Sequence, residues 1–133
     1  MSTFSKFEDI EAWQKARILG ELIFSLTKKK IFDSDYKLRG QMNGSSGSIM
    51  DNIAEGQGRG GNKEFVQFLW ISKGSSAELR SQLYRCLERN WIDKNTFDDL
   101  YNQAETIEKM IQGIINYLQN SDSKGIKYKN RNT

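Results

Sequence analysis

The sequence contains no histidine, no proline and only one cysteine, Cys86. Histidine is the commonest general base and metal ligand of proteins, so its absence removes the most frequent forms of acid–base and metal chemistry. Proline interrupts helices, so its absence permits long continuous ones. A single cysteine cannot form an internal disulfide, and we therefore expect a reducing, cytoplasmic compartment.

Long apolar runs are also missing. No stretch approaches the 18 or so consecutive apolar residues that a membrane-spanning helix needs. The first residues, Met1 to Glu8, have no apolar run and lack the pattern of a signal peptide. We therefore expect no association with a membrane.

Net charge is absent from most of the chain. The net charge of the 133 residues is +3, and residues 1–119 contain equal numbers of acidic and basic side chains. The whole excess lies in residues 120–133, which hold Lys124, Lys127, Lys129 and Arg131 against one aspartate. A nucleic-acid site on the body of the protein would therefore require local clustering of charge.

Apolar residues recur with helical spacing in four segments, which we expect over about 8–30, 35–56, 62–90 and 96–118. The last segment has the most regular stripe: Phe97, Leu100, Ala104, Ile107, Ile111, Ile114 and Leu118. Four long amphipathic helices joined by three short turns predict an all-α, antiparallel up-down-up-down four-helix bundle. We assign residues 1–119 to this bundle domain and residues 120–133 to a disordered basic tail.

Glycine is concentrated in the second helical segment and in the turn that follows it. Gly40, Gly44 and Gly47 lie inside the second helix, where each costs about 1 kcal/mol relative to alanine. We expect these small residues to allow close approach to a neighbouring helix.

The third helix carries two apolar faces. An inner seam begins at Phe65, and a second set repeats every seven residues about 140° away around the helix. The second set predicts an oligomer interface formed by Trp70, Ala77, Tyr84 and Trp91. The alternative is that neighbouring helices of the same chain cover Trp70 and Tyr84.

Polar residues interrupt the core positions of the second and third helices. We expect a hydrogen-bonded layer that fixes the register of the helices, formed by Asn52, Glu55, Ser72, Ser75 and Glu78. A hydrolase using Glu55 and Glu78 as a carboxylate pair is a rival interpretation. A di-metal carboxylate bundle needs Glu-x-x-His pairs, so the lack of histidine argues against it. We predict no catalytic residue, no metal and no cofactor.

A glycine-rich turn separates the second and third helices. Gly56, Gly58 and Gly61 formally match a dinucleotide-binding pattern, but no strand precedes them, which makes the match weak. Arg59, Lys63 and the free N–H groups at the start of the third helix could hold a phosphate. Together with the four basic tail residues, they are the candidate nucleic-acid contacts. The alternative is that the glycines only permit a tight turn and that the tail is a solvated terminus.

These motifs resemble one known family. Asn52-Ile53-Ala54-Glu55-Gly56, Gly58-Arg59, and the segment from Glu64 to Leu79 are similar to the bacterial four-helix-bundle proteins of 23S rRNA intervening sequences. The opening Phe7-Glu8-Asp9-Ile10 and Ala12-Trp13-Gln14-Lys15-Ala16 resemble the start of that family. The resemblance covers roughly residues 4 to 119. Two positions depart from it: Met50 stands where the family often has proline, and Asn43-Gly44 where it often has basic residues.

The resemblance implies a fold and an assembly. A related family, the accessory variability determinants of diversity-generating retroelements, forms homopentameric barrels that bind nucleic acid and a reverse transcriptase. By resemblance, we expect a non-enzymatic homo-oligomer, a pentamer, that acts as a binding or scaffold protein with RNA or DNA as ligand. The rival is an adaptor for another protein that uses the aromatic face and binds no nucleic acid.

Overall fold

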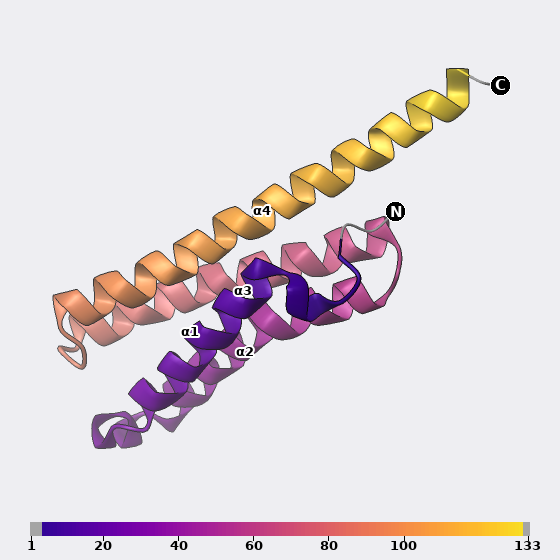
Figure 1. Ribbon diagram of the computed structural model, residues 1–133. Helices are drawn as coiled ribbons and strands as arrows, with labels where there is room; N and C mark the ends of the chain where they lie inside the picture. Colours follow the sequence, from indigo (N-terminus) through magenta and orange to yellow (C-terminus); the bar gives the residue numbers. More distant parts are fainter. Residues whose placement is uncertain (1–3, 132–133) are drawn as a thin grey trace.

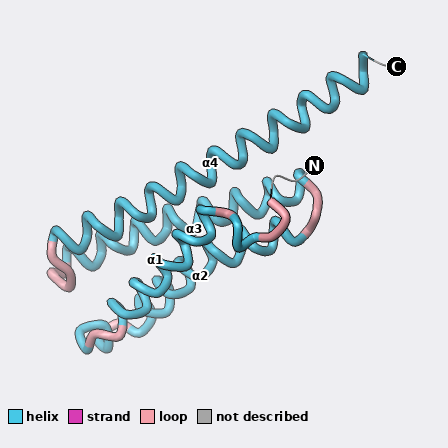
Figure 2. The backbone as a smooth tube through the Cα atoms, in the orientation of Figure 1, coloured by secondary structure: helices cyan, strands magenta, loops and turns pink. Residues whose placement is uncertain are grey.

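A computed structural model describes the backbone of residues 4–131 and the side chains of residues 4–121. Within these limits, the chain forms only helices, joined by short loops (Figure 2). In chain order, the elements are η1 (Phe7–Asp9), α1 (Glu11–Thr27), η2 (Lys30–Ser34), α2 (Tyr36–Gly58), α3 (Asn62–Glu88) and α4 (Lys94–Arg131). The four α-helices run alternately up and down (Figure 1), which confirms the all-α four-helix bundle.

The order of the helices around the bundle follows from their contacts. α2 packs against α1 and α3, and α4 packs against α3 and, less extensively, against α1. The helices α1 and α3 therefore occupy diagonal corners, and their outer faces point to opposite flanks of the molecule.

One apolar core runs through the bundle. Its largest fully buried side chains are Ile10, Leu19, Ile23, Phe32, Leu38, Met42, Ile49, Ile53, Leu69, Leu79, Leu83 and Ile107. In α4, the stripe continues from Ile111 to Ile115, whereas the predicted Ile114 is only half-buried. Both isoleucines satisfy a 3-4 spacing between Ile111 and Leu118, so the packing angle of α4 decides which of them is buried.

Local hydrogen bonds set the ends of the helices. Asp35 caps α2 by accepting a hydrogen bond from the N–H of Leu38 at 2.9 Å. This bond, followed by the Arg89 guanidinium, lowers the pKa of the Asp35 carboxyl. At the end of α3, Asn90 adopts a left-handed conformation with φ 59°, and the N–H of Trp91 donates to the carbonyl of Cys86 at 2.9 Å. This pair of features is a Schellman motif, which ends the helix sharply.

The glycines of α2 do not have the role that we expected. A Cβ atom added at Gly40, Gly44 or Gly47 would meet no atom within 4 Å, so these residues do not mediate a close helix contact. The expectation is wrong because all three lie on the outer side of α2. Gly56 is the position of close approach, because an added Cβ would lie 2.8 Å from the Cβ of Phe68.

α4 is longer than predicted. It remains helical to Arg131, whereas we expected it to end near Leu118, and its last turns project beyond the bundle (Figure 1). The side chains of Lys124, Lys127, Lys129 and Arg131 lie outside the described ones, and the flexibility of the tail stays a prediction. In the part of the chain that the structure describes, no helix is both long and apolar enough to cross a bilayer.

Candidate interaction surfaces

The turn between α2 and α3 presents the candidate phosphate site. Gly60 adopts a left-handed conformation with φ 86°, which reverses the chain directly after Arg59. The Arg59 guanidinium forms an ion pair with Glu55 one turn earlier, at 2.7 Å, and lies 5.1 Å from the centre of the Phe68 ring. Lys63 is exposed at the start of α3. The turn therefore brings both predicted cations near one end of the bundle, but the charge of Arg59 is already partnered.

The first turn of α3 carries a negative charge of its own. The Glu64 carboxylate lies against Gly61, so close that a Cβ on this glycine would approach its oxygen to 2.3 Å. A carboxylate at a helix N-terminus is stabilised by the free N–H groups and the helix dipole, as a phosphate would be. Glu64 thus occupies the position at which a phosphate would have to bind.

The predicted aromatic face is divided among three environments. The Trp91 ring meets Phe32 edge-on at 5.0 Å, and the Tyr84 ring contacts the Phe97 ring of α4 at 4.8 Å. Trp70 remains 46% exposed, with the Lys73 ammonium 5.0 Å from its ring centre. Ala77, which lies between Trp70 and Tyr84 in the sequence, is half-buried. Tyr84 stays 47% exposed despite this contact, so Trp70 and Tyr84 are the two outward-facing members of this set.

Among the exposed large apolar residues, two pairs are candidates for contact surfaces. On α3, Ile71 is 52% exposed beside Trp70. We name these two residues the α3 patch. On α1, Ile18 and Leu22 lie one turn apart and are 58% and 39% exposed. We name them the α1 patch. Ile18 and Leu22 each line a groove against α4, so the α1 patch lies on the side of α1 that faces α4.

A polar layer joins α2 to α3. Ser48 and Ser75 share a hydrogen bond of 2.8 Å, and the Asn52 amide donates to the Ser48 hydroxyl at 2.9 Å. The Ser72 hydroxyl donates to the backbone carbonyl of Ile49 at 2.6 Å. These bonds link residues that are 23 and 27 positions apart in the chain, so they tie one register of α3 to α2.

The two glutamates proposed for this layer lie apart. Glu78 accepts a hydrogen bond from Ser45 at 2.7 Å, whereas Glu55 is turned outward to Arg59. Ser45 and Glu55 are ten residues apart on α2, which corresponds to about 15 Å along the helix. The structure therefore brings Asn52, Ser72 and Ser75 into the layer, places Glu78 at its margin, and does not form a pair of Glu55 with Glu78.

A second polar cluster, which sequence reasoning missed, joins α3 to α4. The Arg80 guanidinium binds both carboxylate oxygens of Glu108, and its third nitrogen donates to the Tyr101 hydroxyl at 2.9 Å. Ser76 donates to the backbone carbonyl of Ala104 at 2.9 Å beside it. Hydrogen bonding to Glu108 raises the pKa of Arg80. An arginine and a glutamate 28 residues apart leave no local signal in the sequence.

Chemically reactive groups are not assembled into a centre. The Cys86 sulfur is fully buried and contacts the Met42 sulfur at 3.6 Å, and burial raises the pKa of its thiol to about 11. A thiol with such a pKa is a poor nucleophile at neutral pH. Among the described residues, no three acidic or cysteine side chains are grouped so that they could hold a metal ion.

The architecture defines the protein as an antiparallel four-helix bundle with a small polar layer and two exposed apolar patches. The model of the 23S rRNA-intervening sequence protein family matches residues 8–113, and the chain belongs to this family. The fold is also similar to a crystal structure from Bacteroides thetaiotaomicron VPI-5482, of a protein of unknown function from the S23 ribosomal protein family. The TM-score is 0.74 at 21% identity, with 79% of this chain and 95% of that chain covered. A comparison with curated proteins gives no match.

Proposed function

We propose that this protein is a non-enzymatic, homo-oligomeric scaffold whose assembled form binds RNA or DNA. The observation that carries the proposal is the pair of exposed apolar patches on the diagonal helices α1 and α3. Exposed apolar clusters rimmed by polar residues usually mark contact surfaces. The separation of Glu55 from Glu78 removes the carboxylate pair on which the rival hydrolase depended.

The position of the patches favours one type of assembly. If the α1 patch of one copy contacts the α3 patch of the next, the first copy keeps its α3 patch free and the second keeps its α1 patch free. Such head-to-tail contacts produce closed rings when the rotation between copies closes. A ring of five copies is the number that the family resemblance implies.

Two features favour nucleic acid as the ligand: the membership of the family and the positive charge of the tail. The family is named for intervening sequences of 23S rRNA. Each copy adds a net charge of +3 in residues 120–133, whereas its body is neutral. A ring would collect the tails of all copies at one rim and so multiply weak phosphate contacts.

Light scattering coupled to size-exclusion chromatography tests the assembly. We expect the full chain to be an oligomer at micromolar concentration and the variants Ile18→Glu and Trp70→Glu to be much weaker in association. The control Ile31→Glu changes a 47% exposed residue of η2 outside both patches and should assemble normally.

Mixing the two patch variants tests the head-to-tail arrangement. Trp70→Glu retains an intact α1 patch and Ile18→Glu an intact α3 patch, so the mixture should form a mixed dimer that cannot grow further. If each variant instead dimerises alone, like patches pair with like and the ring is excluded. A monomeric wild-type chain would overturn the scaffold, and the exposed Trp70 would then favour the adaptor function.

A further inference from the structure

A groove lies where the start of α1 passes the second half of α4. It has a volume of about 550 Å³, within the range of roughly 300–1,000 Å³ in which proteins hold small ligands or short peptide segments. Its walls include Ile10 and Ala12 from the α1 side and Met110 and Ile114 from α4. The limited contact between α1 and α4 explains why this seam of the bundle stays open.

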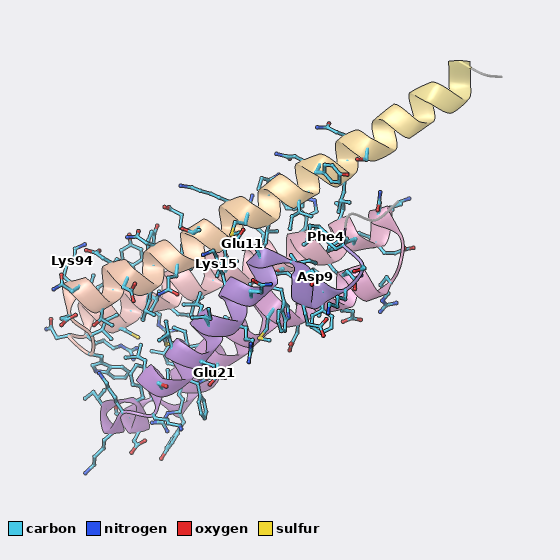
Figure 3. The ribbon with its side chains drawn as sticks, viewed as in Figure 1. Phe4, Asp9, Glu11, Lys15, Glu21 and Lys94 are labelled. Carbon is cyan, nitrogen blue, oxygen red and sulfur yellow. The ribbon has the colours of Figure 1, made fainter. Side chains whose placement is uncertain are left out.

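The rim of this groove is acidic. Asp9 and Glu11 contribute to the lining, and no lysine or arginine does. Both carboxylate-bearing residues are exposed, and the nearest cation of Glu11 is Lys15 at the long distance of 3.9 Å. Figure 3 shows Phe4, Asp9 and Glu11 together at this end of α1, with Glu21 farther along the helix. The site therefore suits a segment that is apolar at its centre and positively charged at its sides.

The C-terminal tail has this chemistry. Residues 124–129 read Lys-Gly-Ile-Lys-Tyr-Lys, in which Ile126 and Tyr128 alternate with three lysines. The rest of the chain is electrically neutral overall, so the whole net positive charge of the molecule lies in this tail.

The tail does not reach the groove of its own chain. α4 passes the groove at Ile114 and continues as a helix to Arg131, away from α1 (Figure 1). Ten helical residues extend about 15 Å. The projecting end is therefore presented to another molecule.

We infer that the groove between α1 and α4 receives the basic C-terminal segment of α4 from a second copy of the chain. On the helix, Lys127 and Lys129 lie on either side of Ile126, about 100° and 60° around the axis. Ile126 fills the apolar floor, and these two lysines meet Asp9 and Glu11. This inference rests on the proposed self-association. The tail contact is additional to the contact between the apolar patches, which lie outside the groove. Exchange of tails would lock neighbouring subunits together and leave Lys124 and Arg131 of each tail for nucleic acid.

Charge reversal in the full-length protein tests the contact. We expect Asp9→Lys/Glu11→Lys and Lys127→Glu/Lys129→Glu each to weaken association tenfold or more, measured by sedimentation equilibrium, because attraction becomes repulsion on one side. Combining all four substitutions in one chain should restore most of the association. The matched control Glu21→Lys/Asp51→Lys changes two exposed carboxylates that do not line the groove and should have little effect beyond that of overall charge.

The outcomes separate the two proposals. A monomeric wild-type chain would overturn both. An oligomer whose association is unchanged by all the reversals, or is not restored by the fourfold combination, would overturn the tail exchange and leave the patches as the contact. If Asp9→Lys/Glu11→Lys does not fold by circular dichroism, the tail variant, whose changes lie beyond the bundle, decides the question.

A disulfide experiment distinguishes a second copy from the same chain. Gly113 lines the groove, is exposed, and has no atom within 4 Å of an added Cβ, so Gly113→Cys should be tolerated. Mixing this variant with Ile126→Cys should produce a disulfide between the two different chains upon oxidation. The native Cys86 is buried and should not interfere. A disulfide that forms only when both substitutions are in one chain would overturn the second copy as the occupant.

Discussion

Arg80 of α3 and Glu108 of α4 form a two-pronged ion pair at the edge of the core, in which the side chain of Glu108 is only 10% exposed. Removal of one partner leaves the other charge buried without compensation. We expect Glu108→Ala to lower the free energy of unfolding by roughly 2–3 kcal/mol. This is less than the loss when a fully buried ion pair is broken, because Arg80 keeps some access to water. Urea denaturation measures the change.

The double variant Arg80→Leu/Glu108→Leu provides the control. Replacing both members of a buried pair with apolar residues is often neutral or stabilising. The double variant should therefore be clearly more stable than Glu108→Ala. Equal losses in the two variants would show that the ion pair is not the source of the effect.

Substitution by alanine should have opposite effects on stability at Gly44 and at Gly56. Gly44→Ala adds a methyl group where no atom lies within 4 Å, so it should stabilise the protein by about 1 kcal/mol through helix propensity alone. Gly56→Ala would place a methyl group 2.8 Å from the Cβ of Phe68 and should destabilise by about 1–3 kcal/mol. Thermal unfolding of the two variants, compared at one protein concentration, measures the contrast. A loss of stability in Gly44→Ala would contradict the open surroundings of that residue.

The sequence predicted the helices well because a bundle is specified by local periodicity. Apolar residues spaced three and four apart define each helix, and the loops contain recognisable interruptions such as Gly60 and Gly61. The outward position of Gly44 was also accessible, since it follows the core residue Met42 by two positions, about 200° around the helix.

The candidate surfaces were less predictable because they depend on the packing of separate helices. The pairing of Arg80 with Glu108 requires the register of α3 on α4, and the choice of Ile115 over Ile114 requires the tilt of α4. The seven-residue repeat correctly placed Trp70 outside the core, but it could not show that Phe32 covers Trp91. The groove between α1 and α4 likewise exists only where two helices fail to meet.

The buried Cys86 predicts a loss of stability in alkaline solution. Burial raises the pKa of its thiol to about 11 from an ordinary value of 9.0. A group whose pKa is raised by folding stabilises the folded state below its unfolded pKa, and this contribution is lost as the pH rises through the folded value. Between about pH 9 and 11, Cys86 should therefore account for a decline of about 2–3 kcal/mol in the free energy of unfolding.

Comparison with Cys86→Ala isolates this contribution. The variant keeps every lysine and tyrosine, whose titration acts equally in both proteins, and it lacks the thiol. The difference in unfolding free energy between the two proteins should therefore shrink as the pH rises from 9 to 11. A difference that stays constant over this range would show that the thiol does not titrate with a raised pKa.

The Glu64 carboxylate should weaken the binding of phosphate at the α2–α3 turn. Lys63 is exposed beside it, whereas Arg59 is held by Glu55. We therefore expect Glu64→Gln to increase the affinity for a structured RNA hairpin, because it removes a negative charge from the N-terminus of α3 without changing the shape of the side chain. Fluorescence anisotropy across a salt series measures the affinity.

The salt dependence of Lys63→Gln shows whether this turn contacts the nucleic acid at all. Each lost phosphate contact on a duplex should reduce the slope of log affinity against log salt concentration by about 0.9. A chain that ends at residue 119 should lose several such contacts, because the tail carries four basic residues. If removal of the tail abolishes the salt dependence while Lys63→Gln and Glu64→Gln leave it unchanged, the tail alone binds phosphate. If the wild-type chain binds no RNA or DNA even at low salt, nucleic acid is not its ligand.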